Sequence, residues 1–456
     1  MKLDKVSNIY FLGIGGIGMS ALARYFMANK KNIAGFDRTA TPLTHQLTEE
    51  GAFIHYEDNP NLIPDVFLLN QNTLVIYTPA IPKLNAELNF FKNHQFSMLK
   101  RSQVLGLLST EKNCIAVAGT HGKTTVSSIT AHLLNNSIVG CSAFLGGITT
   151  NYNSNLILNG KSNNLVVEAD EFDRSFLQLY PNLAVITSMD ADHLDIYSNH
   201  QNLYNSFQEF VNQIHKEGIL ILKLGLENKV KSQGSCYTYS LSESSASFYI
   251  KNLQLIDGTY HFSIIGPDLQ IDELSIGMAG KINVENALAA TAAAFLSGAK
   301  PHEIKNALAT FKGVKRRMEI VLKQKDFIYI DDYAHHPEEL KQSIQSVKAL
   351  YPNKAICGIF QPHLFSRTRD FADEFAESLS LLDHLILLEI YPAREEPIPG
   401  IDSTFLLNKI KIKNKVLLQK NELIPFLKDN KPEVLMSLGA GDIDRFVEKI
   451  KLEFEC

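Results

Sequence analysis

The stretch CIAVAGTHGKTT, residues 114–125, is a short apolar run that breaks into a loop of glycine and threonine around His-Gly-Lys. The run is typical of a buried β-strand, and residues 126–134 behind the loop favour a helix. Backbone N–H groups in such a loop, together with the N-terminus of the helix, form a site for an anion. The stretch therefore predicts an α/β fold built around a phosphate-binding loop.

The loop has the chemistry of a nucleoside triphosphate site. In the P-loop pattern, Lys123 would reach the β- and γ-phosphates, and the hydroxyl of Thr124 would bind Mg²⁺. Val117 stands where the strict pattern has glycine, so a plain turn between a strand and a helix is the alternative. We predict an ATP-dependent enzyme. The expected nucleotide-binding residues of the loop are Gly119, Thr120, His121, Gly122, Lys123, Thr124 and Thr125.

Composition limits the class of protein. The chain has 456 residues, of which 45% are hydrophobic and 20% charged, and this length predicts two or three domains. A net charge of −5 argues against general affinity for nucleic acid or for an acidic membrane surface. No apolar run approaches the roughly 20 residues that span a bilayer. The apolar run near the start enters a glycine loop instead of a signal-peptide cleavage site.

The five cysteines, at positions 114, 141, 236, 357 and 456, are scattered and show no metal-binding spacing. An odd, dispersed set in a long chain is typical of reduced thiols in the cytoplasm. We therefore expect a cytoplasmic enzyme with no nucleic-acid or membrane partner. Its expected oligomeric state is a monomer or a homodimer.

Alternation of strand and helix divides the chain into three segments. Residues 1–110 and 316–456 each alternate apolar strands with helices, which predicts Rossmann-like parallel sheets. Residues 111–315 should form a central P-loop ATPase-type α/β domain. Period-two alternation between residues 218 and 276 predicts an antiparallel patch on that domain. The expected strands are 8–12, 32–35, 74–77, 165–167, 184–187, 327–330, 355–360, 385–390 and 434–438, and the expected helices include 19–29 and 287–297.

A second glycine loop, GIGGIG at residues 13–18, follows the first strand and opens a helix. Taken alone, it predicts a dinucleotide site, with Asp37 at the end of the next strand on a ribose hydroxyl. Physically, the loop shows only that a pyrophosphate can approach the backbone closely. A nucleotide-diphosphate sugar therefore fits as well as NAD, and a purely structural turn is a further alternative. The presence of the phosphate loop favours the diphosphate sugar.

Acidic residues follow two further strands. Glu168 opens the run EADEFD, residues 168–173, at a strand end beside the phosphate loop. Its carboxylate suits Mg²⁺, which prefers oxygen ligands, while the other acids of the run are expected to be solvated or to cap a helix. His193 lies within DADHLD, residues 190–195. It is a candidate metal ligand or an orienter of a second cation, and a paired surface imidazole is the alternative.

Polar residues also follow two strands of the last segment. DDYAHHP, residues 331–337, closes one apolar strand, and FQPH, residues 360–363, closes the next. Polar groups at the carboxyl ends of adjacent parallel strands are where open α/β sheets bind ligands. The glycine turn at residues 439–442 could present N–H groups to an anion, and helix-capping aspartates with surface histidines are the structural alternative. The candidates are Asp332, His335, His336 and Arg367, whose guanidinium offers a fork for a carboxylate or a phosphate.

In this order, GTHGKTT, EADE, DADHLD, DDYAHHP, FQPH and GAGD resemble the motifs of the Mur ligases, the ATP-dependent amide-forming enzymes of peptidoglycan synthesis. The resemblance covers essentially the whole chain. It implies an N-terminal Rossmann-like domain for a UDP-sugar, a central ATPase, and a C-terminal Rossmann-like domain for an amino acid. It also implies ATP and Mg²⁺ as cofactors, and UDP-N-acetylmuramate and L-alanine as substrates.

The resemblance assigns roles to residues of this chain. Lys123 would bind the phosphates of ATP, Thr124 and Glu168 would hold one Mg²⁺, and His193 would help to hold a second. The stretches that approach the base and ribose contain Asn283, Asn286 and Arg317. Those that meet ATP and the amino acid contain Asp332, His335, His336 and Arg367, with either histidine a candidate to assist deprotonation of the amine. The residues expected to bind the UDP-sugar are Gly13, Gly15, Gly16, Gly18, Met19, Ser20, Asp37 and Thr78.

Three other functions stay open at this point. A recycling ligase of the same family, which joins a ready-made tripeptide to UDP-N-acetylmuramate, would need a roomier C-terminal pocket. An NAD-dependent oxidoreductase built on GIGGIG has no use for a lysine that grips a γ-phosphate, so GTHGKTT argues against it. A non-catalytic sensor of the UDP-sugar would not turn over ATP.

Overall fold

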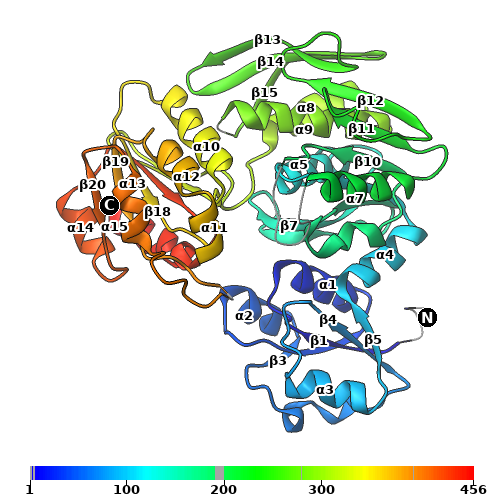
Figure 1. The fold of residues 1–456 in the computed structure, drawn as a ribbon. Coiled ribbons are helices and arrows are strands. Elements are labelled where there is room, and N and C mark those ends of the chain that lie inside the picture. The colour runs from blue at the N-terminus through cyan, green and yellow to red at the C-terminus, as the bar shows by residue number, and fades with distance from the viewer. Residues whose placement is uncertain (1–2, 4–5, 191–199, 279, 394, 456) are drawn as a thin grey trace. The chain divides into compact units, whose positions relative to one another are not determined.

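The computed structural model describes residues 3, 6–190, 200–278, 280–393 and 395–455, and it has the α/β architecture that the sequence predicts (Figure 1). Its described strands form sheets of five, ten and six strands in order along the chain. The chain is divided into two compact units. The first comprises Met1–Lys251, Ser263–Asp272 and Asn286–Leu308, and the second comprises Asn252–Phe262, Glu273–Glu285 and Ala309–Cys456. The domain boundaries expected at residues 110 and 315 stay a prediction.

The N-terminal sheet is parallel throughout, with the strand order β3-β2-β1-β4-β5. Its strands are β1 (Asn8–Leu12), β2 (Asn32–Phe36), β3 (Phe53–His55), β4 (Thr73–Tyr77) and β5 (Ser97–Lys100). Its helices are α1 (Ile17–Ala28), α2 (Pro42–Glu49), η2 (Pro60–Leu62), η3 (Asp65–Phe67), α3 (Ala86–Asn93) and α4 (Arg101–Glu111). The GIGGIG loop directly follows β1, so it lies at the carboxyl edge of the sheet, and the place of β1 in the strand order puts it at the middle of that edge. Open parallel sheets bind ligands at this edge.

The central sheet has the strand order β15-β14-β13-β12-β11-β10-β6-β9-β7-β8. Its strands are β6 (Asn113–Ala118), β7 (Ser142–Thr149), β8 (Ser154–Ile157), β9 (Asn164–Glu168), β10 (Leu183–Ile186), β11 (Ile219–Lys223), β12 (Ser235–Ser240), β13 (Phe248–Ile256), β14 (Thr259–Gly266) and β15 (Leu269–Ile276). Its helices are α5 (Lys123–Asn135), η4 (Phe172–Gln178), α7 (His200–Asn212), α8 (Lys281–Leu296) and α9 (Pro301–Thr310). Strand β6 lies between β9 and β10 and is parallel to both, so the phosphate loop emerges beside their carboxyl ends.

The antiparallel patch expected over residues 218–276 is only partly correct. Strands β13, β14 and β15 are neighbours in the sheet and are joined by short turns at residues 257–258 and 267–268, as in an antiparallel meander. The expectation is wrong for β11 and β12, because β11 pairs in parallel with both β10 and β12. Period-two alternation indicates a half-exposed strand, and it carries no information about the direction of its neighbour.

One apolar core lies beneath both of these sheets. Phe11 of β1 and Phe26 of α1 belong to the same cluster of buried residues as Ala116 of β6 and Val167 of β9. Helix α1 also contacts β7 and β8 of the central sheet directly. The N-terminal and central sheets are therefore packed together within the first compact unit.

The C-terminal sheet has the strand order β16-β17-β21-β18-β19-β20, and all its pairs are parallel except β16 with β17. Its strands are β16 (Glu319–Lys323), β17 (Ile328–Asp332), β18 (Ile356–Phe360), β19 (His384–Leu387), β20 (Lys415–Leu417) and β21 (Val434–Leu438). Its helices are α10 (Pro337–Leu350), α11 (Phe365–Asp370), α12 (Ala372–Leu379), α13 (Ser403–Lys409), α14 (Leu423–Asp429), η5 (Asp442–Phe446) and α15 (Val447–Phe454). Alternate residues of the strands, such as Ile330 and Tyr329, enter two separate cores, one beneath α10, α12 and α13 and the other beneath α14 and α15.

The predicted strands all occur close to their expected positions. The strand expected at 385–390 ends earlier, at Leu387, and the helix expected at 287–297 begins earlier, at Lys281. Among the described residues, the helices lack the length and apolarity that crossing a bilayer requires.

Glu87 of α3 is a fully buried acid beneath the N-terminal sheet. The Tyr10 hydroxyl lies 2.6 Å from its Oε2 and 2.8 Å from Nε2 of His55. Nδ1 of His55 lies 2.9 Å from the backbone oxygen of Glu57, which only accepts, so Nδ1 carries a hydrogen. Burial raises the pKa of Glu87 to about 7 and lowers the pKa of His55. The two shifts favour a neutral acid beside a neutral imidazole.

We expect Glu87 to make the stability of the protein depend on pH. Since its pKa rises from 4.5 to about 7 on folding, the stability that its proton contributes is complete below about pH 4.5 and is lost as the pH rises through about 7. His55 acts in the opposite direction, because its lowered pKa adds stability that is lost only as the pH falls below about 6.5. Urea unfolding at about pH 6.5 and pH 8 should therefore show a larger fall in stability for the wild type than for Glu87→Gln. Equal falls in the two proteins would contradict the assignment.

Candidate active site

Strand β6 ends at Ala118 and helix α5 begins at Lys123, so residues 119–122 form the phosphate loop. Gly119 and Gly122 have φ angles of +132° and +83°, which L side chains rarely adopt. A Cβ atom on Gly119 would lie 2.1 Å from Oγ1 of Thr187, and one on Gly122 would lie 2.9 Å from Oδ1 of Asn286. The backbone is therefore close-packed at both positions. The loop leads directly into the N-terminus of α5, and this is the arrangement that an anion site requires.

The segment after β10 holds the loop in shape. Oγ1 of Thr187 donates to the backbone oxygen of His121, and the backbone N–H of His121 donates to Oγ of Ser188 at 2.8 Å. Oγ1 of Thr120 lies 2.9 Å from Oγ of Ser188 and accepts from the backbone N–H of Asp190 at 3.1 Å. Thr120 and His121 thus shape the loop, while their contact with a nucleotide stays a prediction.

Lys123 carries a partly buried ammonium group beside the loop. Its Nζ donates to the backbone oxygen of Gly119 at 2.7 Å and to Oε1 of Glu171 at 2.9 Å. Burial alone would lower the pKa of Lys123, but the carboxylates of Glu171, Asp170 and Glu168 raise it by more, so the pKa lies above its ordinary value. Lys123 therefore stays positively charged, as a phosphate-binding group must.

Glu171 corrects one expectation from the sequence. The acids that follow Glu168 were expected to be solvated or to cap a helix, but Glu171 is fully buried and its Oε2 lies 2.8 Å from Nζ of Lys123. The expectation treated the run EADE as a surface feature, whereas Glu171, the residue before η4, lies against Lys123 of the first turn of α5. No local pattern distinguishes this acid from Asp170, so only the fold identifies it as the partner of Lys123.

The predicted magnesium ligands Thr124 and Glu168 lie together. Oγ1 of Thr124 donates to Oε1 of Glu168 at 3.2 Å, and the backbone N–H of Gly146 on β7 donates to Oε2 at 3.1 Å. A Cβ atom on Gly146 would lie 2.2 Å from Oε2, so glycine is required for this approach. A hydroxyl and a carboxylate are oxygen donors of the kind that Mg²⁺ prefers, and the donor set fits that ion.

His193, the residue expected at a second cation, lies outside the described residues. In the described ranges, no three His, Cys, Asp or Glu side chains gather as a protein-only metal site would require. Mg²⁺ commonly keeps several waters and takes only one or two protein carboxylates together with phosphate oxygens. Metal binding at Thr124 and Glu168 is therefore compatible with this arrangement and stays a prediction.

The residues expected to approach the base and ribose come from two places. Asn283 and Asn286 are buried in the first turns of α8, and Oδ1 of Asn286 lies against Gly122 of the phosphate loop. In the second compact unit, the guanidinium of Arg317 lies 5.0 Å above the ring of Tyr333. The structure brings Asn286 to the loop, and the roles of Asn283 and Arg317 toward a nucleotide stay predictions.

The GIGGIG loop is enclosed by residues that were expected to bind the UDP-sugar. A Cβ atom on Gly13 would lie 2.7 Å from Cγ2 of Thr78, which follows β4. Oδ2 of Asp37 accepts a hydrogen bond from the backbone N–H of Gly15 at 2.8 Å. Asp37 therefore holds the loop itself in shape, and its contact with a ribose stays a prediction.

Helix α1 begins directly after this loop, with Gly16 as its N-cap residue. Met19 and Ser20 of its first turns are buried. Their contact with the UDP-sugar stays a prediction. A Cβ atom on Gly18 would lie 2.7 Å from Nη1 of Arg101, which opens α4. This guanidinium, which the sequence patterns did not indicate, lies beside the first turn of α1.

Histidines gather at the carboxyl edge of the C-terminal sheet. Strands β17 and β18 flank β21, so the segments that follow them meet there. The ring centroids of His335 and His363 lie 6.0 Å apart, and the ring of His336 lies 4.9 Å from that of Phe371. Nδ1 of His335 lies 3.0 Å from the backbone oxygen of Tyr333, which fixes a hydrogen on Nδ1 and leaves Nε2 as the basic nitrogen of the neutral ring.

A partly buried ion pair, which sequence reasoning missed, lies at this edge. Nε of Arg316 lies 3.4 Å from Oδ2 of Asp331, and its Nη2 donates to the backbone oxygen of Gly439. Burial raises the pKa of Asp331 to about 7, against the opposing charge of Arg316. Burial also raises the pKa of Asp332, the predicted site residue beside it. Arg316 thus joins the strand end to the predicted anion-binding turn at residues 439–442.

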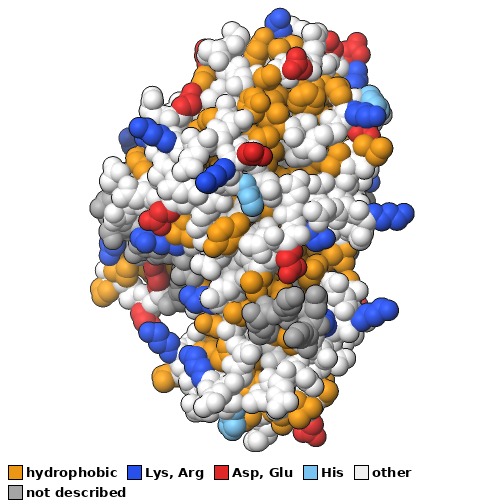
Figure 2. Space-filling model, turned by 90° about the vertical axis from the view of Figure 1, so that its right-hand side faces the viewer, with side chains coloured by type: hydrophobic (Ala, Val, Ile, Leu, Met, Phe, Trp, Pro, Cys, Tyr) orange, Lys and Arg blue, Asp and Glu red, His pale blue; other side chains and the backbone are white. Residues whose placement is uncertain are grey.

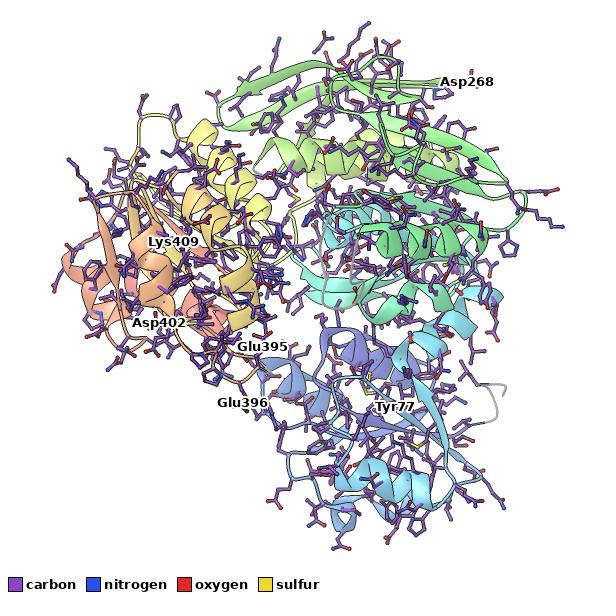
Figure 3. The ribbon with its side chains drawn as sticks, in the orientation of Figure 1. Tyr77, Asp268, Glu395, Glu396, Asp402 and Lys409 are labelled. Atoms are coloured by element: carbon purple, nitrogen blue, oxygen red, sulfur yellow. The ribbon has the colours of Figure 1, made fainter. Side chains whose placement is uncertain are left out.

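Arg367 lies on α11, whose start is held by a neighbouring loop. Glu395, labelled in Figure 3, accepts hydrogen bonds from the hydroxyl and from the backbone N–H of Ser366, the latter at 3.0 Å. Leu364, the N-cap residue of α11, has a φ angle of +73°, an unusual conformation for a bulky residue and one that clusters at functional sites. These constraints define where the helix carrying Arg367 begins.

The described charges are dispersed over the face that Figure 2 shows. Lys and Arg side chains are interspersed there with Asp and Glu, and no large basic patch covers that face. This distribution agrees with the net charge of −5. Any anion site must therefore be local, as the glycine loops are.

Three family profiles match consecutive parts of the chain. They are described as Mur ligase family, catalytic domain (residues 8–113), Mur ligase middle domain (residues 117–294) and Mur ligase, glutamate ligase domain (residues 316–441). Together they account for most of the sequence.

Curated relatives match from end to end. The UDP-N-acetylmuramate–L-alanine ligase of Parabacteroides distasonis is 51% identical over 453 residues, which are 99% of this chain and 98% of the relative. The protein of the same name from Flavobacterium psychrophilum is 50% identical over 455 residues, covering 100% of both chains.

Solved structures share the fold over nearly the whole chain. The UDP-N-acetylmuramate-alanine ligase MurC of Thermotoga maritima superposes with a TM-score of 0.83 at 26% identity, covering 98% of this chain and 99% of that chain. A murein peptide ligase of Psychrobacter arcticus superposes with a TM-score of 0.71 at 21% identity, covering 98% of each, and this likeness concerns the fold alone.

We expect Lys123 and Glu171 to be energetically coupled. Burial raises the pKa of the Glu171 carboxyl and the ammonium of Lys123 opposes that rise, so Lys123→Met leaves a buried acid without its cation. This single variant should lose about 3–5 kcal/mol of unfolding free energy near pH 8. Lys123→Met combined with Glu171→Gln removes both charges and should recover most of the loss. Urea unfolding of the wild type, the two single variants Lys123→Met and Glu171→Gln, and the double variant measures the coupling. If the losses of unfolding free energy in the two single variants simply add in the double variant, the residues are not coupled.

Proposed function

The chain belongs to the Mur ligase family, and on that premise we propose that it joins L-alanine to UDP-N-acetylmuramate with ATP, in peptidoglycan synthesis. The observation that carries the proposal is the end-to-end identity of 51% with an L-alanine ligase. The phosphate loop supports it, because a charged Lys123 lies beside the oxygen donors Thr124 and Glu168. An NAD-dependent oxidoreductase would have no use for these groups.

The proposed chemistry has two displacements. The lactyl carboxylate of the sugar attacks the γ-phosphorus of ATP, the bond to the bridging oxygen breaks, and an acyl phosphate and ADP result. The amine of L-alanine then attacks the acyl carbon, phosphate leaves, and an amide remains. Phosphoryl transfer needs positioning and charge neutralisation more than covalent help from the protein. Lys123, kept charged by its carboxylate neighbours, supplies positive charge where the γ-phosphate would lie.

We propose that Thr124 and Glu168 hold Mg²⁺. When bound, the ion would neutralise charge on the transferred phosphoryl group. The N–H of Gly146 fixes one carboxylate oxygen of Glu168, which leaves the other on the side of Thr124. His193 is the proposed residue for a second cation.

We assign the C-terminal histidines to the amine. L-Alanine carries an ammonium group at neutral pH, and it must lose a proton before it can attack. His335 has its Nδ1 hydrogen directed at the backbone oxygen of Tyr333, so in the neutral ring Nε2 is the nitrogen that carries the lone pair for the proton. His336 is the alternative base, and Arg367 offers a fork for the carboxylate of the amino acid.

The GIGGIG loop is the proposed site of the UDP diphosphate. Its glycines let the backbone approach the phosphates, and Arg101 beside Gly18 adds a positive charge at the N-terminus of α1. We place the reaction in the cytoplasm, where both nucleotides are available, and the free thiols of Cys114, Cys141 and Cys357 agree with a reducing compartment.

The decisive experiment measures phosphate release from ATP with Mg²⁺ and UDP-N-acetylmuramate, with and without L-alanine, and with the tripeptide L-alanyl-γ-D-glutamyl-meso-diaminopimelate as a parallel arm. Release that requires both UDP-N-acetylmuramate and L-alanine supports the proposal. Lys123→Ala should abolish that release while the UDP-sugar still binds in a calorimeter, because the two loops are separate. Release only with the tripeptide would move the assignment to the recycling ligase, and release in no arm would contradict the family's chemistry here.

We expect Gly146→Ala to weaken the use of magnesium. The added Cβ would lie 2.2 Å from Oε2 of Glu168 and would push the carboxylate away from β7. The apparent KM for Mg²⁺ should rise by about 10–100-fold, as it does when residues that orient a metal ligand are replaced. The KM for L-alanine should change little. Gly160→Ala is the matched control, because a Cβ there meets nothing within 4 Å. An unchanged magnesium dependence would exclude Glu168 as a ligand.

A further inference from the structure

Asn155 is a fully buried amide between the N-terminal and central sheets. It lies on β8, and its Nδ2 donates to the backbone oxygen of Ile17 and to Oγ of Ser20 at 3.0 Å. Its Oδ1 accepts a hydrogen bond from Nη1 of Arg24 at 2.8 Å. One side chain of the central sheet therefore bonds to three residues of helix α1, which are spread over about two turns.

Asn155 contacts the end of the GIGGIG loop (residues 13–18), which is the proposed sugar loop. Ile17 is the first residue of α1 and directly follows Gly16 of the GIGGIG loop. Arg24 is held in turn by Glu50 at the end of α2, with Nε to Oε2 at 2.7 Å and Nη2 to Oε1 at 2.8 Å. Hydrogen bonds thus connect the backbone of the loop to β8, and Asn155, which forms the centre of this network, is fully buried.

The same hairpin reaches the proposed magnesium site. Strand β8 pairs with β7, and β7 pairs in parallel with β9, which ends at Glu168. On β7, the N–H of Gly146 fixes Oε2 of Glu168, and the ring of Phe144 lies 5.5 Å from that of Tyr25 on α1. A short path of paired strands and hydrogen bonds therefore connects the first turn of α1 with the carboxylate beside the phosphate loop.

We propose that Asn155 is a positioning residue for phosphoryl transfer, which sets the distance between the sugar loop and the phosphate loop. The proposal rests on the function proposed above. The UDP end of the sugar nucleotide would bind at GIGGIG, while its lactyl carboxylate must reach the γ-phosphate at the other loop. Both loops could bind their ligands normally and still react slowly if this distance were wrong, since a misplacement of about 1 Å can cost about 10²-fold in rate.

Asn155→Asp isolates the contact with α1. The substituted side chain keeps its size and can still accept from Arg24, but it presents an oxygen instead of an N–H to the carbonyl of Ile17. Asn164→Asp is the matched control, because Asn164 on β9 of the same sheet bonds only to Gly140, Ser162 and Asn113 in the contacts that the structure shows. Asn155→Ala is a second variant, which removes the amide without adding charge.

The measurements are kcat, the KM values for ATP, UDP-N-acetylmuramate and L-alanine, and the melting temperature. Asn155→Asp and Asn155→Ala should lower kcat by about tenfold or more while each KM stays within about threefold of the wild type. The control should match the wild type. A kcat equal to that of the control, an equal loss in the control, or a rise in the KM values in step with a loss of folding would each overturn the proposal.

Hydrogen–deuterium exchange of the wild-type protein provides a test that does not depend on a variant folding. The non-hydrolysable analogue AMPPNP with Mg²⁺ should slow exchange in residues 13–28, because the path from Glu168 to Ile17 is continuous. Unchanged exchange there, with protection confined to the phosphate loop, would overturn the proposal. Absence of L-alanine-dependent phosphate release from the wild type would instead defeat the proposed function, so the two failures are distinguishable.

Discussion

The site depends on keeping a charged lysine beside a loop whose two glycine positions have no room for a side chain. Gly119 lies so close to Thr187 that a single Cβ would collide with it, and this close packing directs the backbone oxygen of Gly119 onto Nζ of Lys123. The ammonium is desolvated there and would lose its proton more easily than in water, were it not for Glu171 and its acidic neighbours. The topology supplies these acids, because β6 lies between β9 and β10 and all three strands end at the same edge. The loop, the lysine and the acids are therefore joined in one arrangement by the hydrogen bonds of Lys123.

Sequence reasoning predicted the parts of this site whose signals are local. The apolar run before Gly119, the Lys-Thr pair behind it and the acid at the end of the next strand each have a recognisable pattern, and parallel strand order brings them together. The same reasoning could not find Glu171, Arg316 or Asn155, because the feature that matters in each case is a partner far away in the sequence. It was also wrong about the direction of β11 and β12. Alternating polarity shows which face of a strand is exposed to solvent, but it does not show whether the neighbouring strand is parallel or antiparallel.

The GIGGIG loop shows why a glycine pattern alone leaves its ligand open. In a dinucleotide site the acid after the second strand binds a ribose, and here Asp37 also shapes the loop, because its Oδ2 accepts from the N–H of Gly15. The loop is also tied to a neighbouring sheet, since Asn155 bonds to the first turn of α1 and one apolar core lies beneath both sheets. The loop therefore works as part of the ATP-binding unit, and this context favours a diphosphate whose other end reacts at the phosphate loop.

Charge balance around Lys123 argues for the divalent cation that the proposed function includes. Glu168, Asp170 and Glu171 all act on the pKa of Lys123, so one positive charge is surrounded by three acids before any nucleotide arrives. A triphosphate adds several more negative charges to this partly buried region, where repulsion between like charges is screened less than in bulk water. Lys123 cannot offset this on its own, because its hydrogen bonds are shared with Glu171 and Gly119. A cation between Thr124, Glu168 and the phosphates would reverse the sign of the local field and turn Glu168 from a source of repulsion into a ligand. The acids that make Lys123 a reliable cation are thus the reason why ATP should bind here together with its metal ion.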